Sequence, residues 1–505
     1  MTNAAPQTHR PLVLTAMVLA AFMAAIEGTI VATAMPSIAA EIGGFSLYSW
    51  VYSSFLLMQA VAIPIFGKLS DLLGRKPVFI AGVVVFLAGS VACGFATSMG
   101  MLVAFRFVQG LGAGAVQPIT TTLAGDLYSL EERGRVQGYL SSVWGISSIA
   151  GPLVGGIIVH SVGWAWIFWA NVPLGIAAIV LMGRYLHEGV AHGERNIDYA
   201  GAVLLLAAVG PLMLALTQGS GWGMRAVVPL LAMSAAAFAL FVRQERRAPD
   251  PLMHMELWSA PLIRNANVAT LTSGIMMIGV ITFLPTFVQG VLGGSALLAG
   301  FTLSVMTVGW PLASFAAGHL IVTQGVRRIV RVGGVAALAG TLTIALTAAH
   351  GALGAGAGSF VLGVGLGLLN TTFVVAIQAS VPWSQRGVAT ASNMLMRILG
   401  SALGAALFGG VLNRRMGRYV ADAGLAGHVS VDSIQELMGG ESAPHGAAAL
   451  DAATRALLRT GLSGSLHLVF WGIAALGVLT LLFALRVPEM DRDAATDVDL
   501  SSAMH

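Results

Sequence analysis

The stretch that decides the fold of this chain reads Gly67-Lys68-Leu69-Ser70-Asp71-Leu72-Leu73-Gly74-Arg75-Lys76-Pro77. It carries one acid and three cations, and it separates two apolar runs at residues 48–67 and 78–97. About 20 apolar residues are needed to cross a bilayer as a helix. A short charged segment between two runs of that length predicts two membrane-spanning helices joined at the membrane surface.

The composition of the whole chain predicts a polytopic membrane protein. Of its 505 residues 56% are apolar and only 10% are charged, and the mean hydropathy is +0.83. A soluble domain is usually about 25% charged, so this chain has too few charges to cover a water-facing surface. Cys93 is the single cysteine, which excludes an intrachain disulfide. Basic residues are scattered among the loops, so nucleic acid is not an expected partner.

The same length criterion predicts fourteen spans. They cover residues 12–34, 48–67, 78–97, 100–122, 136–160, 165–186, 198–217, 224–243, 263–289, 297–322, 329–350, 354–380, 393–413 and 465–486. With the N-terminus inside, most of the 26 Lys and Arg fall in cytoplasmic loops and tails, as the positive-inside rule requires. We therefore expect both termini in the cytoplasm and the 414–464 loop outside, with short helices at 431–438 and 447–458.

An internal repeat divides these spans into two halves. Three short patterns recur about 250 residues later: Gly67 and Gly74 as Gly318 and Gly325, Glu132-Arg133-Gly134 as Gln385-Arg386-Gly387, and Gly155-Gly156 as Gly409-Gly410. Parallel halves of this kind are typical of transporters with a substrate site at the bilayer midplane. We expect a six-helix bundle at 1–190, two inserted helices at 191–250, and a second bundle at 251–505 that includes the 414–464 loop.

Glu27 is the one charged side chain in the first apolar segment, residues 11–34. An ionised group at such depth costs roughly 2.5–3.5 kcal/mol. Because burial favours the neutral form of a carboxyl group, Glu27 is predicted to bind and release a proton. The alternative for Glu27 is a permanent ion pair with Arg106 of the fourth span. The alternative for Arg106 is that its side chain extends to the outer interface of the membrane.

The charged loop resembles motif A of the major facilitator superfamily, Gly-x-x-x-Asp-x-x-Gly-Arg-Lys/Arg. The resemblance implies a charge cluster that locks the cytoplasmic side between the two halves, formed by Gly67, Asp71, Gly74, Arg75, Lys76 and, at the end of span four, Asp126. The alternative for these charges is ordinary control of membrane topology. Residues 106–114 resemble motif B, whose buried Arg, here Arg106, is implicated in proton coupling.

Span five resembles motif C, the antiporter motif Gly-x-x-x-Gly-Pro-x-x-Gly-Gly. The candidate residues in this stretch are Gly145, Gly151, Pro152, Gly155 and Gly156. Residues 27–36 and 164–173 further resemble the fourteen-span drug:proton antiporters. That family usually has Asp where Glu27 stands, and Glu still titrates. The resemblance implies the two-bundle fold of the superfamily with two added helices, in a bacterial inner membrane.

The expected function is proton-coupled efflux of amphipathic or cationic compounds by alternating access. The proton gradient would supply the energy, with no cofactor and no metal, and a periplasmic adaptor is a partner that the family allows. Lipid or siderophore export on the same fold is the main alternative, followed by proton symport and a membrane-embedded enzyme. An ATP-driven pump is excluded because neither of the two lysines, Lys68 and Lys76, lies in a phosphate-binding loop pattern. The candidate residues for the substrate cavity are Tyr52, Gln59, Gln117, Met276, Phe283, Trp310, Asn370 and Gln378.

Overall fold

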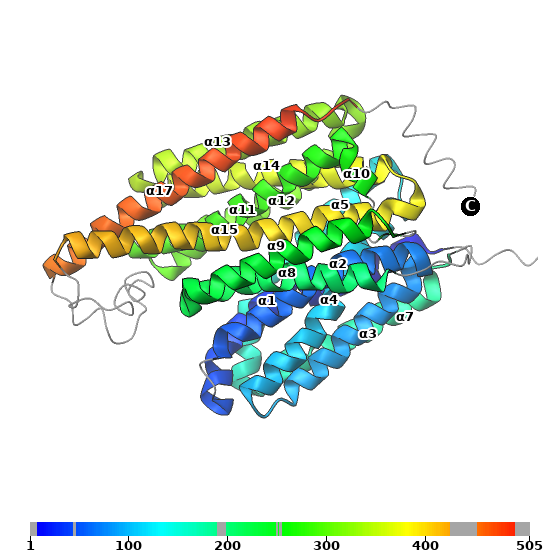
Figure 1. Ribbon diagram of the computed structural model, residues 1–505, viewed down its shortest axis with the longest axis horizontal. Coiled ribbons are helices and arrows are strands. Elements are labelled where there is room, and N and C mark those ends of the chain that lie inside the picture. The colour runs from blue at the N-terminus through cyan, green and yellow to red at the C-terminus, as the bar shows by residue number, and fades with distance from the viewer. Residues whose placement is uncertain are drawn as a thin grey trace, which may run out of the picture. The chain divides into compact units, whose positions relative to one another are not determined.

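The computed structural model describes residues 8–43, 47–188, 198–248, 251, 255–424 and 452–489. Within these residues all regular structure is helical, as Figure 1 shows. A bilayer offers the backbone no hydrogen-bond partners, so a spanning segment must satisfy its own N–H and C=O groups, which a helix does. The predicted all-α membrane architecture is confirmed.

The helices follow one another with short connections. In chain order they are α1 (Arg10–Ile42), α2 (Tyr48–Leu73), α3 (Arg75–Gly94), α4 (Met99–Leu127), α5 (Leu130–Ser161), α6 (Trp166–Trp169), α7 (Asn171–Tyr185), α8 (Tyr199–Trp222), α9 (Met224–Glu245), α10 (Met255–Ser259), α11 (Pro261–Gly290), α12 (Ala296–Gln324), α13 (Val326–Thr347), α14 (Ala352–Ala379), α15 (Arg386–Asp422) and α17 (Ala452–Leu485). Short 3-10 helices lie at Ala348–His350 and Trp383–Gln385.

Each predicted span is matched by a helix, with α6 and α7 together forming the sixth. In the described residues, 12 helical stretches are long and apolar enough to cross a membrane. A thirteenth is α5, whose parts Glu132–Ser148 and Leu153–Ser161 meet at 47°. Pro152 lies in that break, where a proline removes a helical hydrogen bond. The apolar described part of α8, Ala200–Leu216, is shorter than the other spans.

The helices on either side of the predicted 414–464 loop are longer than the apolar runs indicate. α15 continues to Asp422, and α17 already begins at Ala452. Leu412, Met416 and Val420 are buried at four-residue spacing, while Arg414, Arg415 and Arg418 on the same helix are exposed. The helix therefore continues as an amphipathic one beyond the point where its apolar run ends. The predicted helix at 431–438 lies outside the described residues.

The chain forms two compact units. Among the described residues, unit 1 comprises those up to Arg264 and Val374–Leu395, and unit 2 comprises Asn265–Phe373 and those from Met396 to Glu489. The inserted helices belong to unit 1, where α8 packs against α2 and α9 packs against α8. The helix α15 begins in unit 1 and continues into unit 2. The three-part division expected from the sequence stays a prediction.

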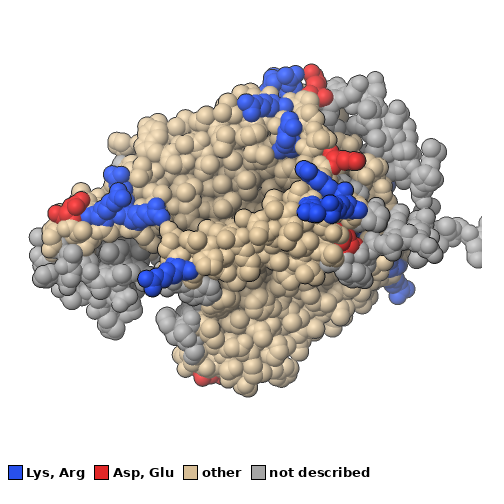
Figure 2. Space-filling model, viewed as in Figure 1, with Lys and Arg blue, Asp and Glu red and all other residues tan. Residues whose placement is uncertain are grey.

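Exposed charged side chains lie mainly toward the ends of the helices. On the face shown in Figure 2, Lys and Arg gather toward the helix ends, and the surface between them consists of uncharged residues. Apolar side chains such as Phe238, Leu240 and Val228 of α9 are exposed to the surroundings of the protein. This distribution suits a surface that faces hydrocarbon rather than water.

Candidate functional site

Glu27 and Arg106 form a buried ion pair in unit 1. Oε1 of Glu27 lies 2.6 Å from Nη1 of Arg106, and the relative exposure is 0% for Glu27 and 1% for Arg106. Oε2 of Glu27 accepts a hydrogen bond of 2.9 Å from Nδ2 of Asn171. Asn171 is the first residue of α7, after the break that separates α7 from α6. The pair thus connects α1, α4 and α7.

The remaining donors of Arg106 are also directed inward. Its Nε donates to the backbone carbonyl of Val51 at 3.1 Å, and Nη1 donates to Oε1 of Gln109 at 2.7 Å. The guanidinium lies over the ring of Phe55, 4.2 Å from the centroid, an arrangement that stabilises a desolvated cation. Arg106 therefore faces the interior of unit 1 and does not extend to the outer interface.

Ser90 of α3 completes the network. Its Oγ accepts hydrogen bonds from Nε2 of Gln109 and Nδ2 of Asn171, each at 3.1 Å, and donates to the carbonyl of Phe168 at 2.8 Å. Removing one partner from a buried pair leaves an uncompensated charge and costs about 3–5 kcal/mol. Protonation of Glu27 would remove the negative charge that faces Arg106, so it is expected to require a rearrangement of this network.

The antiporter motif of α5 packs on α1 beside Glu27. A Cβ on Gly151 would overlap Oγ1 and Cβ of Thr29, and a Cβ on Gly155 would lie 2.9 Å from Cγ1 of Ile30. The hydroxyl of Thr29 donates to the carbonyl of Ser147 at 3.0 Å. Small residues at helical spacing allow such close backbone contact between membrane helices. Gly145 is partly buried.

Replacing Gly151 with Ala is expected to separate α1 from α5 and to lower the stability of the purified protein by about 1–3 kcal/mol, the usual cost of overpacking. The thermal unfolding midpoint in detergent measures this change. Gly156→Ala is the matched control, because nothing lies within 4 Å of a Cβ at that position. Equal shifts for the two variants would contradict close packing at Gly151.

The motif A loop closes one end of unit 1. Asp71 lies 2.6 Å from Nη1 of Arg75, and its two carboxylate oxygens accept hydrogen bonds from the backbone N–H groups of Gly387 and Val388, each at 2.9 Å. Those groups are at the N-terminus of α15, where unpaired N–H groups and the helix dipole favour an anion. The loop is thereby bound to residues more than 300 positions later in the chain.

Asp126 at the end of α4 bridges two arginines. Its Oδ2 lies 3.0 Å from Nε of Arg75, and its Oδ1 lies 3.3 Å from Nη1 of Arg386. Arg75 also donates to the carbonyl of Trp383 at 3.1 Å and lies over the ring of that residue. We call Asp71, Arg75, Asp126 and Arg386 the charge cluster.

The other motif A residues shape the turn that carries the cluster. Gly74 has a φ of +93° between α2 and α3, a conformation that L side chains rarely adopt. Lys76 donates through Nζ to the carbonyl of Leu186 at 2.8 Å, and Gly67 lies against Gly387, where a Cβ would be 3.0 Å from the carbonyl oxygen. Glu188 accepts from the backbone N–H groups of Arg75 and Lys76, and burial raises the pKa of Glu188.

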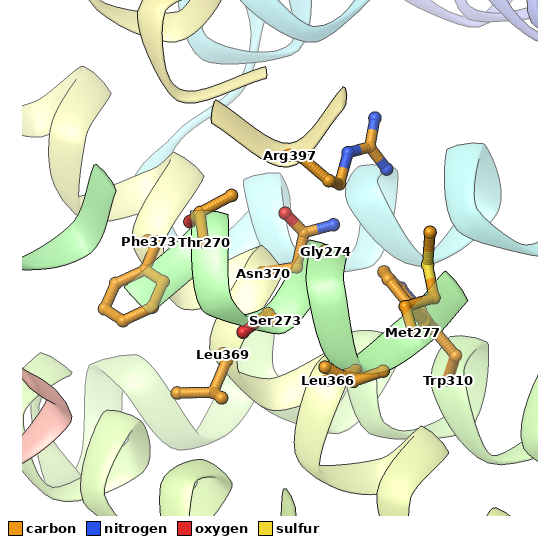
Figure 3. A pocket seen from close by; sticks show the side chains of 10 residues that line it. All are labelled: Thr270, Ser273, Gly274, Met277, Trp310, Leu366, Leu369, Asn370, Phe373 and Arg397. Carbon is orange, nitrogen blue, oxygen red and sulfur yellow. The ribbon is translucent and has the colours of Figure 1, made fainter. Parts of the chain in front are cut away.

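Unit 2 contains a separate small pocket between α11, α12, α14 and α15. Two of the candidate cavity residues, Trp310 and Asn370, line it together with Thr270, Ser273, Gly274, Met277, Leu366, Leu369, Phe373 and Arg397 (Figure 3). Its atom-free space, counted out to the open mouth, is about 280 Å³. That space includes open solvent, so the enclosed part of the pocket is far smaller and admits a small group rather than a drug-sized molecule.

The other candidate cavity residues lie elsewhere. Met276 is fully buried and accepts a hydrogen bond from Thr480, so Met277, one residue further around α11, lines the pocket instead. Phe283 packs against Phe408. In unit 1, the candidates Gln59 and Gln117 are buried, and Tyr52 is partly buried.

Gln378 is part of the region around the charge cluster. Its Nε2 donates to the carbonyl of Thr121 at 2.9 Å, and its carbonyl accepts from Nε of Arg386 at 3.1 Å. Sequence reasoning placed Gln378 in the substrate cavity and gave no role to Arg386, Ser90 or Asn171. The repeated Arg-Gly pair at 386–387 was the signal for the second arginine of the cluster. No sequence signal singled out Ser90.

Comparison with known proteins places this arrangement in a family. The sequence profile of the Major Facilitator Superfamily matches residues 17–405. The multidrug transporter protein MdtP of Bacillus subtilis is 32% identical over 496 residues, 93% of this chain and 92% of the relative. Multidrug resistance protein 3 of Bacillus subtilis is 34% identical over 414 residues, 81% of each chain.

Solved structures agree on the fold. The human organic anion transporter MFSD10 matches with a TM-score of 0.64 at 14% identity, covering 95% of this chain and all of that one. The proton:xylose symporter XylE matches with a TM-score of 0.63 at 13% identity, covering 95% of this chain and 96% of that one. On its motifs, its helices and these relatives, the chain belongs to the Major Facilitator Superfamily, among its multidrug transporters, and is not an enzyme.

Proposed function

We propose that this protein is a proton-coupled antiporter that exports amphipathic compounds by alternating access across a bacterial inner membrane, with both termini in the cytoplasm. The observation that carries the proposal is the buried Glu27–Arg106 ion pair. Within unit 1, Glu27 also accepts a hydrogen bond from Asn171, and Arg106 donates one to the carbonyl of Val51. A chain retains a titratable carboxylate at such depth, despite its cost, where the group serves transport.

The geometry supports a coupling role because Glu27 connects two packing contacts of α1. On one side its carboxylate binds Arg106 and Asn171. Two residues further on, Thr29 packs against the antiporter motif at Gly151. Gain of a proton by Glu27 would weaken its contact with Arg106 and Asn171. The helix α1 could then shift along its contact with the antiporter motif at Gly151. Loss of the proton would restore the network.

The charge cluster supports the role of a conformational lock. Its carboxylates and arginines connect the loop between α2 and α3 with the start of α15. These residues belong to opposite halves of the sequence repeat, so alternating access would require their contacts to open in one state. In the described residues these contacts, all of them within unit 1, are formed.

Purified protein in liposomes tests the proposal. An imposed pH gradient is expected to drive accumulation of a fluorescent amphipathic dye against its concentration gradient, and an ionophore that collapses the pH gradient is expected to stop it. Adding dye to the detergent-solubilised protein is expected to release protons into a weakly buffered medium. Dye accumulation that persists without any ion gradient, or that follows only a sodium gradient, would refute proton coupling.

A further inference from the structure

Arg397 is the one arginine in the pocket of unit 2, and it lies at the middle of the helices. On the neighbouring α11, a Cβ on Gly274 would overlap the carbonyl of Arg397, and Ser401 donates to the carbonyls of both residues. Trp310, near the middle of α12, lines the same pocket. The close contact between α11 and α15 fixes the backbone from which the arginine side chain extends.

Within unit 2, the described residues offer this guanidinium no hydrogen bond and no ion pair. The sequence explains the lack of a counter-ion, because it contains no Asp or Glu between Glu256 and Asp422. Arg106, the other intramembrane arginine, has a carboxylate, an amide and a backbone carbonyl as partners. The two arginines therefore differ in kind: one is neutralised by the protein and the other is not.

The deep carboxylate of unit 1 is already engaged. Both oxygens of Glu27 are hydrogen-bonded, one to Arg106 and one to Asn171. Asp71 and Asp126 are likewise bound to arginines of the charge cluster. An intramembrane arginine normally pairs with an acid or with backbone carbonyls, and the described residues give Arg397 neither, so its charge is available to a ligand.

The rest of the pocket has the composition of a site for the acidic end of an amphiphile. Figure 3 shows Asn370 beside Arg397, with Thr270 to the left of Asn370 and Ser273 below it in this view. The amide of Asn370 can donate a further hydrogen bond to a carboxylate, whereas the hydroxyl of Ser273 already donates to the carbonyl of Ala269. Trp310 and Phe373 supply aromatic surface at the pocket wall. The small enclosed volume suits a single functional group such as a carboxylate, with the rest of the molecule outside the pocket.

We propose that Arg397, assisted by Asn370, binds the carboxylate of amphipathic substrates, so that the exported compounds include organic acids and zwitterions as well as cations. This inference deepens the proposed function, since it names a substrate class for the transporter. A guanidinium matches a carboxylate through two parallel hydrogen bonds, which Lys cannot reproduce.

Binding to the full-length protein in detergent tests the inference apart from transport. The probes are a rhodamine dye with a free benzoate group and the methyl ester of the same dye, measured by fluorescence polarisation. Wild type is expected to bind the acid about tenfold or more tightly than the ester, the usual value of a hydrogen bond to a charged group. Arg397→Gln is expected to lose this preference with unchanged affinity for the ester, and Arg397→Lys to keep part of it.

Arg414→Gln is the matched control, because it removes the same charge from an exposed position of α15 and is expected to keep the preference. A wild type that binds both dyes equally, or an Arg397→Gln variant that still prefers the acid, overturns the inference. If Arg397→Gln does not elute as a single species in size exclusion, the test rests on wild type and Arg397→Lys: the wild type must prefer the acid, and Arg397→Lys must show a weaker preference. Gradient-driven transport of both dyes without preference would refute the carboxylate site but not proton-coupled antiport. Preferential binding of the acid without gradient-driven transport would refute antiport but not the carboxylate site.

Discussion

Replacing Glu27 with Gln is expected to abolish proton-coupled export in a protein that still folds, with a smaller loss of stability than the removal of Arg106 causes. The amide keeps the shape of the side chain and an oxygen that can accept from Arg106, so most of the network can form. It cannot bind and release a proton in the physiological range. In liposomes, pH-gradient-driven dye accumulation is expected to fall to the level of protein-free vesicles, and dye-induced proton release is expected to vanish.

Two further variants make this result interpretable. Glu41→Gln changes an exposed glutamate on the same helix α1 and is expected to export at the wild-type rate. Glu27→Asp keeps a titratable carboxyl and is expected to retain coupling with a changed rate, since its side chain is one methylene shorter. Undiminished coupled export by Glu27→Gln would show that the proton is carried elsewhere.

Removing Arg106 is expected to cause the largest loss of stability. Arg106→Met leaves the carboxylate of Glu27 buried without its cation, at a cost of about 3–5 kcal/mol. The double variant Glu27→Gln with Arg106→Met carries no buried charge at this position, so it is expected to recover much of that loss. Thermal unfolding of the four proteins in detergent gives the interaction energy of the pair as a double-mutant cycle.

Arg10→Met provides the comparison for this cycle. Arg10 lies 3.7 Å from Glu132, with relative side-chain exposures of 57% and 47%. Exposed ion pairs contribute about 0–1 kcal/mol, so this substitution is expected to have little effect on the unfolding temperature. If Arg106→Met were equally mild, or if the double variant were no more stable than Arg106→Met, the buried pair would not be the stabilising contact described.

The sequence was sufficient for the helices and for the motifs, because both depend on local pattern. Apolar length predicted the spans, and the spacing of Gly67, Asp71 and Gly74 predicted the charged turn. The sequence was insufficient where long-range contacts decide. Asn171 binds Glu27 across 144 positions, and nothing in the polar residues near the break between α6 and α7 indicates which of them faces α1.

The length of the apolar run also did not predict where helix α15 ends. At Arg414 the apolar run ends, but burial of Met416 and Val420 holds the next two turns in place. Periodicity rather than mean hydropathy carries that information. The pocket shows the same limitation on a finer scale, because Met276 and Met277 are equal in composition and differ only in the face of α11 that they occupy.

The continuity of α15 has a mechanical consequence. Its first residues are bound to carboxylates of unit 1. Asp126 forms an ion pair with Arg386, and Asp71 accepts hydrogen bonds from the N–H groups that follow. Eleven residues later, about 16 Å along the axis, the same rod carries Arg397 in unit 2. A rigid rod transmits a tilt or a twist from one end to the other. If the contacts at the start of α15 opened and the helix tilted as a rigid body, Arg397 would move with it, so the proposed lock and the proposed carboxylate site would be linked through one helix.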